Sequence, residues 1–329
     1  LGLAESYLKE EGPSSNLESF LEIMVTNLPD SFTPRSKLYL FYNKIIHFFR
    51  EKTKSRAKKN IIYHYDLGND FYKLWLDKTM TYSSALFKSE KEDLSKAQEN
   101  KYQQLIDQLK IESHHKILEI GCGWGGFAEY AAKNIGCEIK GITISPSQLE
   151  FAKSRIKNQG LDNKVTLELC DYRDLKGKFD RVVSIEMIEA VGEKYWIDYF
   201  KKIKEVLSKG GMAGIQVILI NNKSYERYSK SVDFIQRYVF PGGMLPSQEK
   251  LNENYKKSGL KEIQSSSFGK SYAKTLGIWH EDFINSIKSI RDLGFDSKLE
   301  RIFRYYFSYC RAGFNSEKID VVQKIIKSA

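Results

Sequence analysis

The stretch that decides the fold is residues 116–126, which read KILEIGCGWGG. Its apolar first half predicts a buried strand, and a helical pattern follows it and runs to Asn134. Between them, Gly121, Gly123 and Gly126 have the spacing G-x-G-x-x-G. Glycines at these positions permit a tight turn and let the backbone approach a ligand closely. A strand, this loop and a helix in that order indicate a site for a nucleotide-type ligand.

Outward from the loop, strands and helices alternate along the chain. Further strands are expected at residues 138–145, 165–170, 179–187, 212–220 and 261–268, and helices from 146 onward and at 195–207. This alternation predicts βαβ units and a mostly parallel sheet, so the fold class is α/β. We interpret residues 221–260 as a helical lid insertion over the site, because the alternation stops there and the loop 240–247 holds two prolines.

Two other segments are apolar or aromatic. Residues 38–49 form an apolar, aromatic stretch, and residues 50–59 then hold six basic residues and one acid. An apolar helix that runs into a basic cluster either lies in a membrane interface or is a packed helix before a solvated charge run. Residues 303–314 repeat an apolar side chain at i, i+4, i+7 and i+11, which gives a helix face for the core or for an acyl chain.

Polar residues near the glycine loop discriminate among nucleotides. A dinucleotide site needs an acid at the end of the second strand, yet residues 141–145 read GITIS, which disfavours NAD. Glu119 stands just before the loop, where it could face a cationic ligand. Asp171 follows the third strand, where a carboxylate could accept a hydrogen bond from an adenine amino group. Adenine together with a positive charge suggests S-adenosylmethionine, whose sulfonium is cationic.

The amino-acid composition limits the classes of protein to which this chain can belong. The 329 residues are 41% hydrophobic and 29% charged, which is globular and excludes collagen-like, mucin-like and mostly disordered chains. The formal net charge of +10 predicts an anionic partner such as phospholipid headgroups, nucleic acid or an acidic metabolite. Four cysteines and five histidines lack metal-ligand or disulfide spacing, so we expect no metal and reduced thiols in a cytoplasmic protein. The chain starts at Leu1 without a leader pattern, and we expect an upstream segment.

Eight short sequence motifs, which follow one another in a fixed order, link this chain to a known family. They are HYDLGNDF (64–71), MTYSS (80–84), LEIGCGWGG (118–126), GITISPSQ (141–148), DYRD (171–174), MIEAVG (187–192), FPGGMLPS (240–247) and SYCRAGF (308–314). On these strings the sequence resembles the cyclopropane-fatty-acyl-phospholipid synthases and their mycolic-acid relatives over almost the whole chain.

The resemblance implies a class I methyltransferase fold, which is Rossmann-like, with a seven-stranded sheet and a helical N-terminal part. It divides the chain in two. Residues 1–60 would be the remainder of an N-terminal domain with a basic linker. Residues 61–329 would be the S-adenosylmethionine-dependent methyltransferase domain, with its core sheet from about residue 112.

The same resemblance implies the cofactor contacts. They fall on Tyr82, Ser83, Gly121, Gly123, Thr143, Gln148 and Tyr172, beside the already named Glu119, Gly126 and Asp171. Thr143 and Gln148 would serve the ribose and its polar neighbours in place of the missing acid, and Tyr172 would pack on the adenine. S-adenosylmethionine is therefore the expected cofactor.

In this family the methyl group is transferred to an alkene of an acyl chain, which leaves a cation on that chain. Such a reaction needs a dry site, aromatic rings or anions near the cation, and a base that removes a proton from the new methyl group. Phe, Trp and Tyr make up 13% of the chain, and we assign Tyr272 and Tyr306 to the site.

The resemblance also implies a bound bicarbonate as the base. Its holders map to Glu189 and Tyr272, while a histidine and a cysteine position of the family read Gln216 and Ser84 here. Glutamine can donate to an anion but carries no charge, so the affinity for bicarbonate should fall. Bicarbonate therefore stays an open candidate, and so does ring closure.

The first functional hypothesis is cyclopropane formation on unsaturated phospholipid acyl chains, by a cytoplasmic enzyme held peripherally at the inner face of the cell membrane. A lipid methyltransferase that stops at a methyl or methylene branch is an alternative, and so is a small-molecule amine N-methyltransferase. A catalytically silent protein that binds lipid or nucleic acid is a third class. We expect no nucleic-acid partner, because no RNA-binding motif accompanies the charge, and a homodimer stays open.

Overall fold

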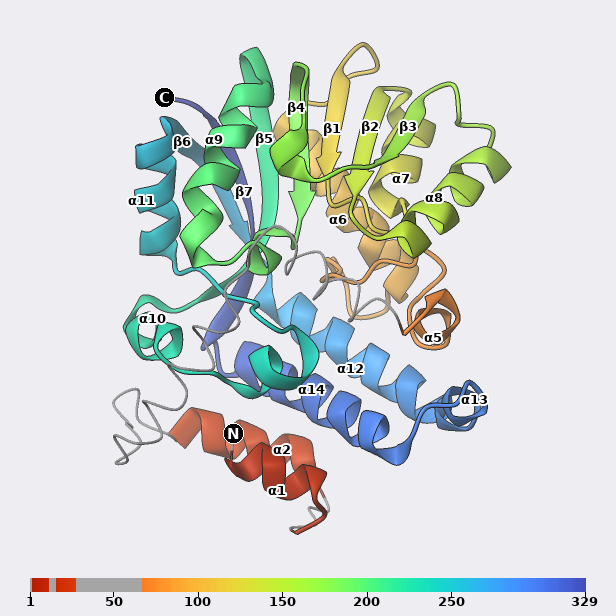
Figure 1. Cartoon of the computed structure of the whole chain (residues 1–329), viewed down its shortest axis with the longest axis vertical. Coiled ribbons are helices and arrows are strands. Elements are labelled where there is room, and N and C mark those ends of the chain that lie inside the picture. Colours follow the sequence, from red (N-terminus) through yellow and green to blue (C-terminus); the bar gives the residue numbers. More distant parts are fainter. Residues whose placement is uncertain (1, 12–15, 28–66) are drawn as a thin grey trace.

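The computed structural model describes residues 2–11, 16–27 and 67–329. The apolar stretch 38–49 and the basic run 50–59 lie outside the described residues, so their interpretation stays a prediction. Figure 1 shows a sheet with helices on both faces and a further group of helices beyond one end of the strands.

Seven strands form one sheet in the order β3-β2-β1-β4-β5-β7-β6. They are β1 Lys116–Ile120, β2 Glu138–Thr143, β3 Val165–Leu169, β4 Phe179–Ile185, β5 Leu207–Ile220, β6 Leu260–Ser267 and β7 Ile319–Ser328. The first five are parallel, and β7 runs antiparallel to β5 and β6. The expected seven-stranded α/β methyltransferase fold is confirmed, and β7 is the strand that sequence periodicity did not indicate.

Helices bury both faces of this sheet. They are α6 Leu94–Leu109, α7 Gly126–Ile135, α8 Pro146–Asn158, α9 Trp196–Val206 and α11 Gln248–Ser258. The first three share one hydrophobic core with the sheet, and the last two share the core on the other face. This double cover explains why β1 is buried at every position but its first. At α8, Ser145 accepts a hydrogen bond from Gln148 N and Pro146 occupies the first turn, which fixes the helix start.

A third layer of helices lies beyond the carboxyl ends of the parallel strands (Figure 1). It comprises α1 Gly2–Leu8, α2 Leu17–Asn27, α5 Asn69–Lys73, α12 Gly269–Asn285, α13 Ile287–Asp292 and α14 Ser297–Asn315. On α14, Phe303 stacks on Phe283 at 5.4 Å between ring centroids, and Phe307 meets Trp75 edge-on at 5.5 Å. The first half of the apolar face at 303–314 therefore belongs to the core.

The segment 221–260, which we expected to form a lid, divides into two parts. α10 (Asn222–Ser229) and the π-helical η4 (Ile235–Val239) belong to a stretch, residues 224–245, that contributes to the cavity described below. α11 instead packs against α9 on the sheet. The cavity-facing part thus ends before α11. The described residues also contain three short 3-10 helices, which are η1 Tyr172–Asp174, η2 Ile188–Ala190 and η3 Glu193–Tyr195.

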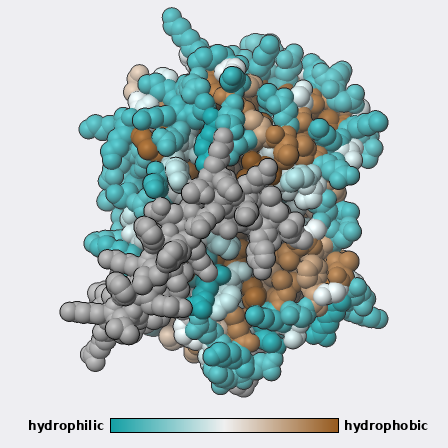
Figure 2. All heavy atoms as spheres, in the orientation of Figure 1, coloured by the Kyte–Doolittle hydropathy of each residue, from teal (hydrophilic) through white to brown (hydrophobic). Residues whose placement is uncertain are grey.

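The described surface on the side drawn in Figure 2 is mostly hydrophilic, with hydrophobic residues gathered in patches. Phe20 and Ile23 on α2 are among the exposed large hydrophobic side chains. None of the helices in the described residues combines the length and the apolar character that a membrane span requires.

Candidate active site

A cavity of about 600 Å³ lies at the carboxyl ends of β1, β2 and β4. Its walls come from the glycine loop, the stretch 224–245, and helices α12 and α14. All ten predicted cofactor residues line it: Tyr82, Ser83, Glu119, Gly121, Gly123, Gly126, Thr143, Gln148, Asp171 and Tyr172. Two of the predicted catalytic residues, Glu189 and Tyr272, line it too, whereas Ser84 and Gln216 are buried behind its wall.

The glycine loop has the backbone that its sequence predicted. Gly121 has φ 83° and Gly123 has φ 50°, both in the left-handed region that favours glycine. A methyl group added at Gly123 would meet no atom within 4 Å, so the loop is open toward the cavity there. At Gly126, by contrast, an added methyl would lie 2.6 Å from the hydroxyl of Tyr102. Gly126 therefore also serves the close packing of α7 against α6.

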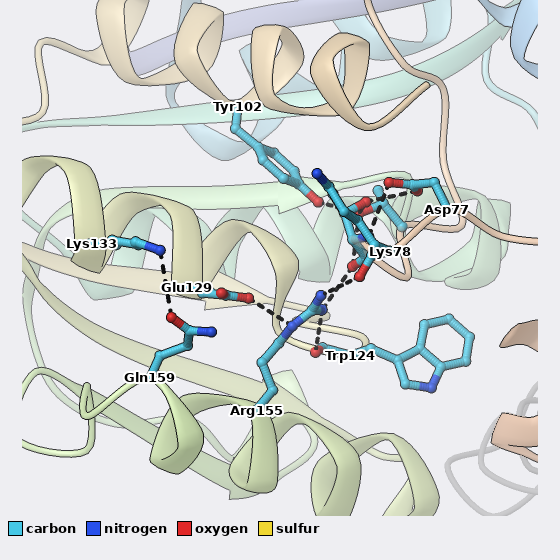
Figure 3. A network of polar contacts seen from close by, with 10 residues as sticks. Asp77, Lys78, Tyr102, Trp124, Glu129, Lys133, Arg155 and Gln159 are labelled. Carbon is cyan, nitrogen blue, oxygen red and sulfur yellow. Dashed lines mark hydrogen bonds and ion pairs between the residues drawn. The ribbon is translucent and has the colours of Figure 1, made fainter. Parts of the chain in front are cut away.

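Arg155 on α8 ties the glycine loop to the segment that carries Tyr82 and Ser83. Its guanidinium donates to the carbonyl oxygens of Lys78 at 2.8 Å, Thr79 at 2.7 Å and Trp124 at 3.1 Å, and it pairs with Glu129 at 2.7 Å (Figure 3). Each of these bonds is charge-assisted. Two stretches about 40 residues apart in sequence are thereby held at one wall of the cavity.

The polar groups near the loop suit a cationic ligand with hydroxyl groups. Glu119 is 3% exposed, and its Oε2 has no hydrogen-bond partner within the described chain. Burial raises the pKa of this carboxyl well above its usual value, although Lys101 opposes the shift. Thr143 Oγ1 donates to Gln148 Oε1 at 3.2 Å, so two buried polar side chains meet at the end of β2. An unpartnered carboxyl oxygen in a cavity wall fits the sulfonium donor that the sequence predicted, because a nearby cation favours the ionised form of Glu119.

The predicted adenine contacts lie beside an arginine that the sequence analysis did not include. Arg173 donates from Nε to Asp171 Oδ1 at 2.8 Å and from Nη2 to Oδ2 at 2.6 Å. Its guanidinium also lies 5.6 Å from the ring centroid of Tyr172. Tyr172 also meets the Tyr199 ring edge-to-face, with 5.4 Å between the ring centroids. These contacts fix the ring in the cavity wall, where a flat base could pack on it.

Glu189 lies on η2, directly after β4, as predicted. Its Oε1 accepts from the backbone N–H of Ile218 at 2.6 Å, and its Oε2 has no hydrogen-bond partner among the described residues. Burial, reinforced by the negative charge of Glu186, raises the pKa of Glu189 to about 8. This side chain is therefore a neutral carboxylic acid at pH 7.

Glu186 was not among the predicted residues, yet three of the four predicted catalytic residues converge on it. Its Oε1 accepts from Ser84 N at 2.9 Å and from Gln216 Nε2 at 2.8 Å, and its Oε2 accepts from the Tyr272 hydroxyl at 2.8 Å. The side chain lines the cavity, and its backbone has φ 49°. The sequence signal was a carboxylate one residue after a buried strand, in the string SIEMIE at 184–189.

A chain of amides holds Gln216 in one orientation. Gln323 Nε2 donates at 3.1 Å both to the carbonyl of Lys101 and to Gln216 Oε1. Because a carbonyl can only accept, these contacts identify the Gln323 amide nitrogen. Gln216 must then turn its own NH₂ group away from Gln323, toward Glu186 and the carbonyl of Ser84.

Lys101 is a buried cation behind this group. It is fully enclosed on α6 and donates to Ser83 Oγ at 2.7 Å. Burial lowers its pKa to about 7, against the opposing attraction of Glu186. Sequence analysis did not single out this lysine, because it lies in a helix rich in polar residues, where a lysine is expected at the surface.

Comparison with known proteins identifies the family of this chain. A family model described as mycolic acid cyclopropane synthetase matches residues 52–324. The chain is 35% identical to the tuberculostearic acid methyltransferase UfaA1 of Mycobacterium tuberculosis, over 98% of this chain and 78% of the relative. It is 33% identical to the cyclopropane-fatty-acyl-phospholipid synthase of Escherichia coli, over 99% of this chain and 82% of the relative.

Solved structures extend the likeness to three dimensions. The mycolic acid cyclopropane synthase CmaA1, complexed with SAH and CTAB, has a TM-score of 0.77 at 26% identity, over 82% of this chain and 97% of that one. Coclaurine N-methyltransferase has the same TM-score over 99% of both chains, but its 17% identity supports the fold alone. With the family matched over residues 52–324, this chain belongs to the mycolic acid cyclopropane synthetase family and is an S-adenosylmethionine-dependent methyltransferase.

Proposed function

We propose that this enzyme transfers the methyl group of S-adenosylmethionine to the double bond of an unsaturated phospholipid acyl chain and closes a cyclopropane ring there. The observation that carries the proposal is the composition of the cavity. One end of the cavity holds the glycine loop and Glu119. The same cavity continues between apolar and aromatic side chains of the stretch 224–245 and of α12 and α14. Those side chains are Ile235, Phe240, Met244, Leu276, Tyr306, Cys310 and Phe314.

When bound, S-adenosylmethionine supplies an electrophilic methyl group on a positively charged sulfur. The chain's residues then have to keep water away and stabilise a positive charge on the lipid. The ring centroids of Tyr272 and Phe314 lie 4.5 Å apart in a tilted arrangement, and those of Tyr306 and Phe240 lie 6.1 Å apart with the rings edge-to-face, so aromatic rings border the apolar end. Aromatic faces attract a cation without adding a nucleophile that would trap it.

A second product class has one supporting observation. The relative at 35% identity is named a tuberculostearic acid methyltransferase, so a lipid C-methyltransferase that leaves a methyl or methylene branch is the second candidate. The donor, the alkene and the need for a base would be shared with ring formation. No comparable observation favours an amine substrate, because the N-methyltransferase likeness is one of fold.

The phospholipid would be reached at a membrane surface. The net charge of +10 favours contact with anionic headgroups, and the acyl chain would have to leave the bilayer to enter the cavity. We therefore place the enzyme in the cytoplasm, associated peripherally with the inner face of the membrane.

The test uses the purified protein, S-adenosylmethionine and vesicles of dioleoyl phospholipid. We expect release of S-adenosylhomocysteine, a lipid heavier by one CH₂ unit, and cyclopropane proton signals in its NMR spectrum. Vesicles of a saturated phospholipid are the matched control and should give no product. Vinylidene proton signals instead of ring signals would replace the first product class by the second. Turnover of soluble amines without turnover of vesicles would refute both.

A further inference from the structure

The three predicted catalytic residues around Glu186 form a ring of hydrogen-bond donors. Ser84 contributes a backbone N–H, Gln216 an amide NH₂ and Tyr272 a phenol, and all three point at one carboxylate in the cavity wall. The family resemblance implied that Ser84, Gln216 and Tyr272 would help to hold a bound bicarbonate. In this chain a side-chain carboxylate already lies among them.

We propose that Glu186 is the general base of the reaction and that its carboxylate does the work expected of a bound bicarbonate. The inference rests on the proposed function, since it assigns the proton-accepting step of that reaction. It applies to either lipid product, because ring closure and methylene formation both require a proton to leave the transferred methyl group.

Three hydrogen-bond donors around Glu186 favour an ionised side chain. A carboxylate accepts hydrogen bonds and cannot donate, whereas a carboxylic acid must place its one proton on an acceptor. Gln216 is oriented by Gln323, so it presents its NH₂ group and not its oxygen. Ser84 presents an N–H. Burial raises the pKa of Glu186, and the nearby Lys101 ammonium together with the three donors opposes that shift and favours the charged form.

The neighbouring Glu189 has the opposite surroundings. It accepts one hydrogen bond, and its second oxygen has no partner within the described residues. Two carboxyl groups that face one cavity therefore differ in protonation, which is how enzymes separate a base from its neutral neighbour. The pKa of Glu189 is raised to about 8 by burial and by the charge of Glu186, so Glu189 is protonated where Glu186 is ionised.

The backbone conformation at Glu186 also supports its assignment as the base. A non-glycine residue at φ 49° is uncommon, and such residues cluster at active sites. Glu186 N donates to the carbonyl of Gln216 at 2.8 Å, which holds the turn against β5. The strained turn directs the carboxylate into the cavity and back onto the three donors.

Atoms and electrons are conserved in the proposed reaction. The alkene π electrons form a new bond to the methyl carbon while the bond between sulfur and that carbon breaks, with its electron pair left on sulfur. The second alkene carbon becomes a cation. Glu186 takes a proton from the new methyl group, and the freed electron pair forms the third bond of the ring. Glu186 is then a carboxylic acid, and its proton passes to water when the product leaves and water enters the cavity.

The experiment compares Glu186→Gln and Glu186→Gly with wild type in buffers depleted of carbon dioxide. Wild type should keep full turnover without added bicarbonate. Glu186→Gln should lose about 100- to 10,000-fold in turnover, the usual contribution of a general base, with little change in the Kd for S-adenosylhomocysteine. Glu150→Gln, on the exposed face of α8, is the matched control and should behave as wild type.

Glu186→Gly adds a rescue test. Glycine suits the left-handed backbone at this position, so we expect the variant to fold. Removal of the side chain leaves the donors of Ser84, Gln216 and Tyr272 facing an empty space the size of a small carboxylate. Formate or bicarbonate, but not chloride, should therefore raise the melting temperature of this variant without any lipid or cofactor, and should restore at least tenfold of its lost turnover.

Each outcome decides the inference. A wild-type enzyme that stops when bicarbonate is removed, or a Glu186→Gln variant with more than about a tenth of wild-type turnover, would overturn it. A Glu186→Gly variant that folds but is neither stabilised nor rescued by formate would show that the donors of Ser84, Gln216 and Tyr272 do not form an anion site. If wild type modifies no lipid at all, the proposed function fails. The melting temperatures with formate would still show whether these three donors bind an anion.

Discussion

Glu186 and Glu189 are separated by two residues and reach the same cavity with different hydrogen-bond partners. Glu186 accepts from three donors, and Glu189 accepts from the backbone of Ile218 alone among the contacts described. At this scale function depends on the count and type of donors, since burial by itself would neutralise both carboxyl groups. The same logic applies to Glu119, which has a free oxygen where a cation would bind.

The first residue-scale prediction concerns Glu189→Gln and pH. Folding raises the pKa of Glu189 from about 4.5 to about 8, so its stabilising effect is complete below pH 4.5 and is lost as pH rises through 8. Glutamine does not titrate. From pH 5 to 8 the wild type should therefore lose stability relative to the variant, by at most about 1.4 kcal/mol per pH unit. Urea unfolding at several pH values measures this, and parallel pH curves would contradict it.

The second concerns the glycine loop. Gly123→Asp should abolish binding of S-adenosylhomocysteine, because the new carboxylate would project into the open space of the cavity. Gly160→Asp is the matched control: Gly160 also has a left-handed φ, 66°, and open space around it, but it lies at the exposed end of α8. Calorimetric titration of both variants separates occupation of the site from backbone strain. Normal binding by Gly123→Asp would remove the loop from the cofactor site.

At the scale of elements, α14 has two uses along one face. Phe303 and Phe307 pack into the aromatic core with α12, whereas Cys310 and Phe314 line the cavity. The i, i+4, i+7, i+11 pattern that ran through all four residues could not separate these uses, because one stripe can face a core at one end and a cavity at the other. The separation comes from the position of α14 across the ends of the strands (Figure 1).

An element-scale prediction follows for Cys310→Trp. The larger side chain would fill part of the apolar end of the cavity, so turnover of long acyl chains should fall by more than tenfold while the Kd for S-adenosylhomocysteine stays within about threefold. Lys298→Trp places the same side chain at an exposed position on the same helix and should leave turnover unchanged. Equal loss for short and long chains would show that position 310 does not border the acyl chain.

At the scale of the whole molecule, the cavity joins layers that are separate in sequence. The glycine loop follows β1, the stretch 224–245 follows β5, and α12 and α14 lie between β6 and β7. A ligand that contacts all of these walls stabilises the molecule as one unit, since it binds the assembled form only.

The corresponding prediction is measured by unfolding. With S-adenosylhomocysteine at 100 times its Kd, the free energy of unfolding should rise by about 2.7 kcal/mol, with one transition seen by both far-UV circular dichroism and tryptophan fluorescence. NADH at the same concentration is the control and should cause no shift. A ligand-dependent transition in one probe and an unchanged one in the other would show that the layers unfold independently.

The sequence by itself determined the parallel core, the glycine loop and the residues at the strand ends, because these follow from local periodicity and from backbone conformations that glycine alone readily adopts. The ten residues predicted for the cofactor, most of them through the family resemblance, line the cavity, and the base was left open. Only the tertiary structure decided that Glu186 faces the donors of Ser84, Tyr272 and Gln216, which are 102, 86 and 30 residues away in sequence. Hydrogen bonds between such distant residues depend on strand order and on helix packing across the sheet, and no local pattern of side chains encodes them.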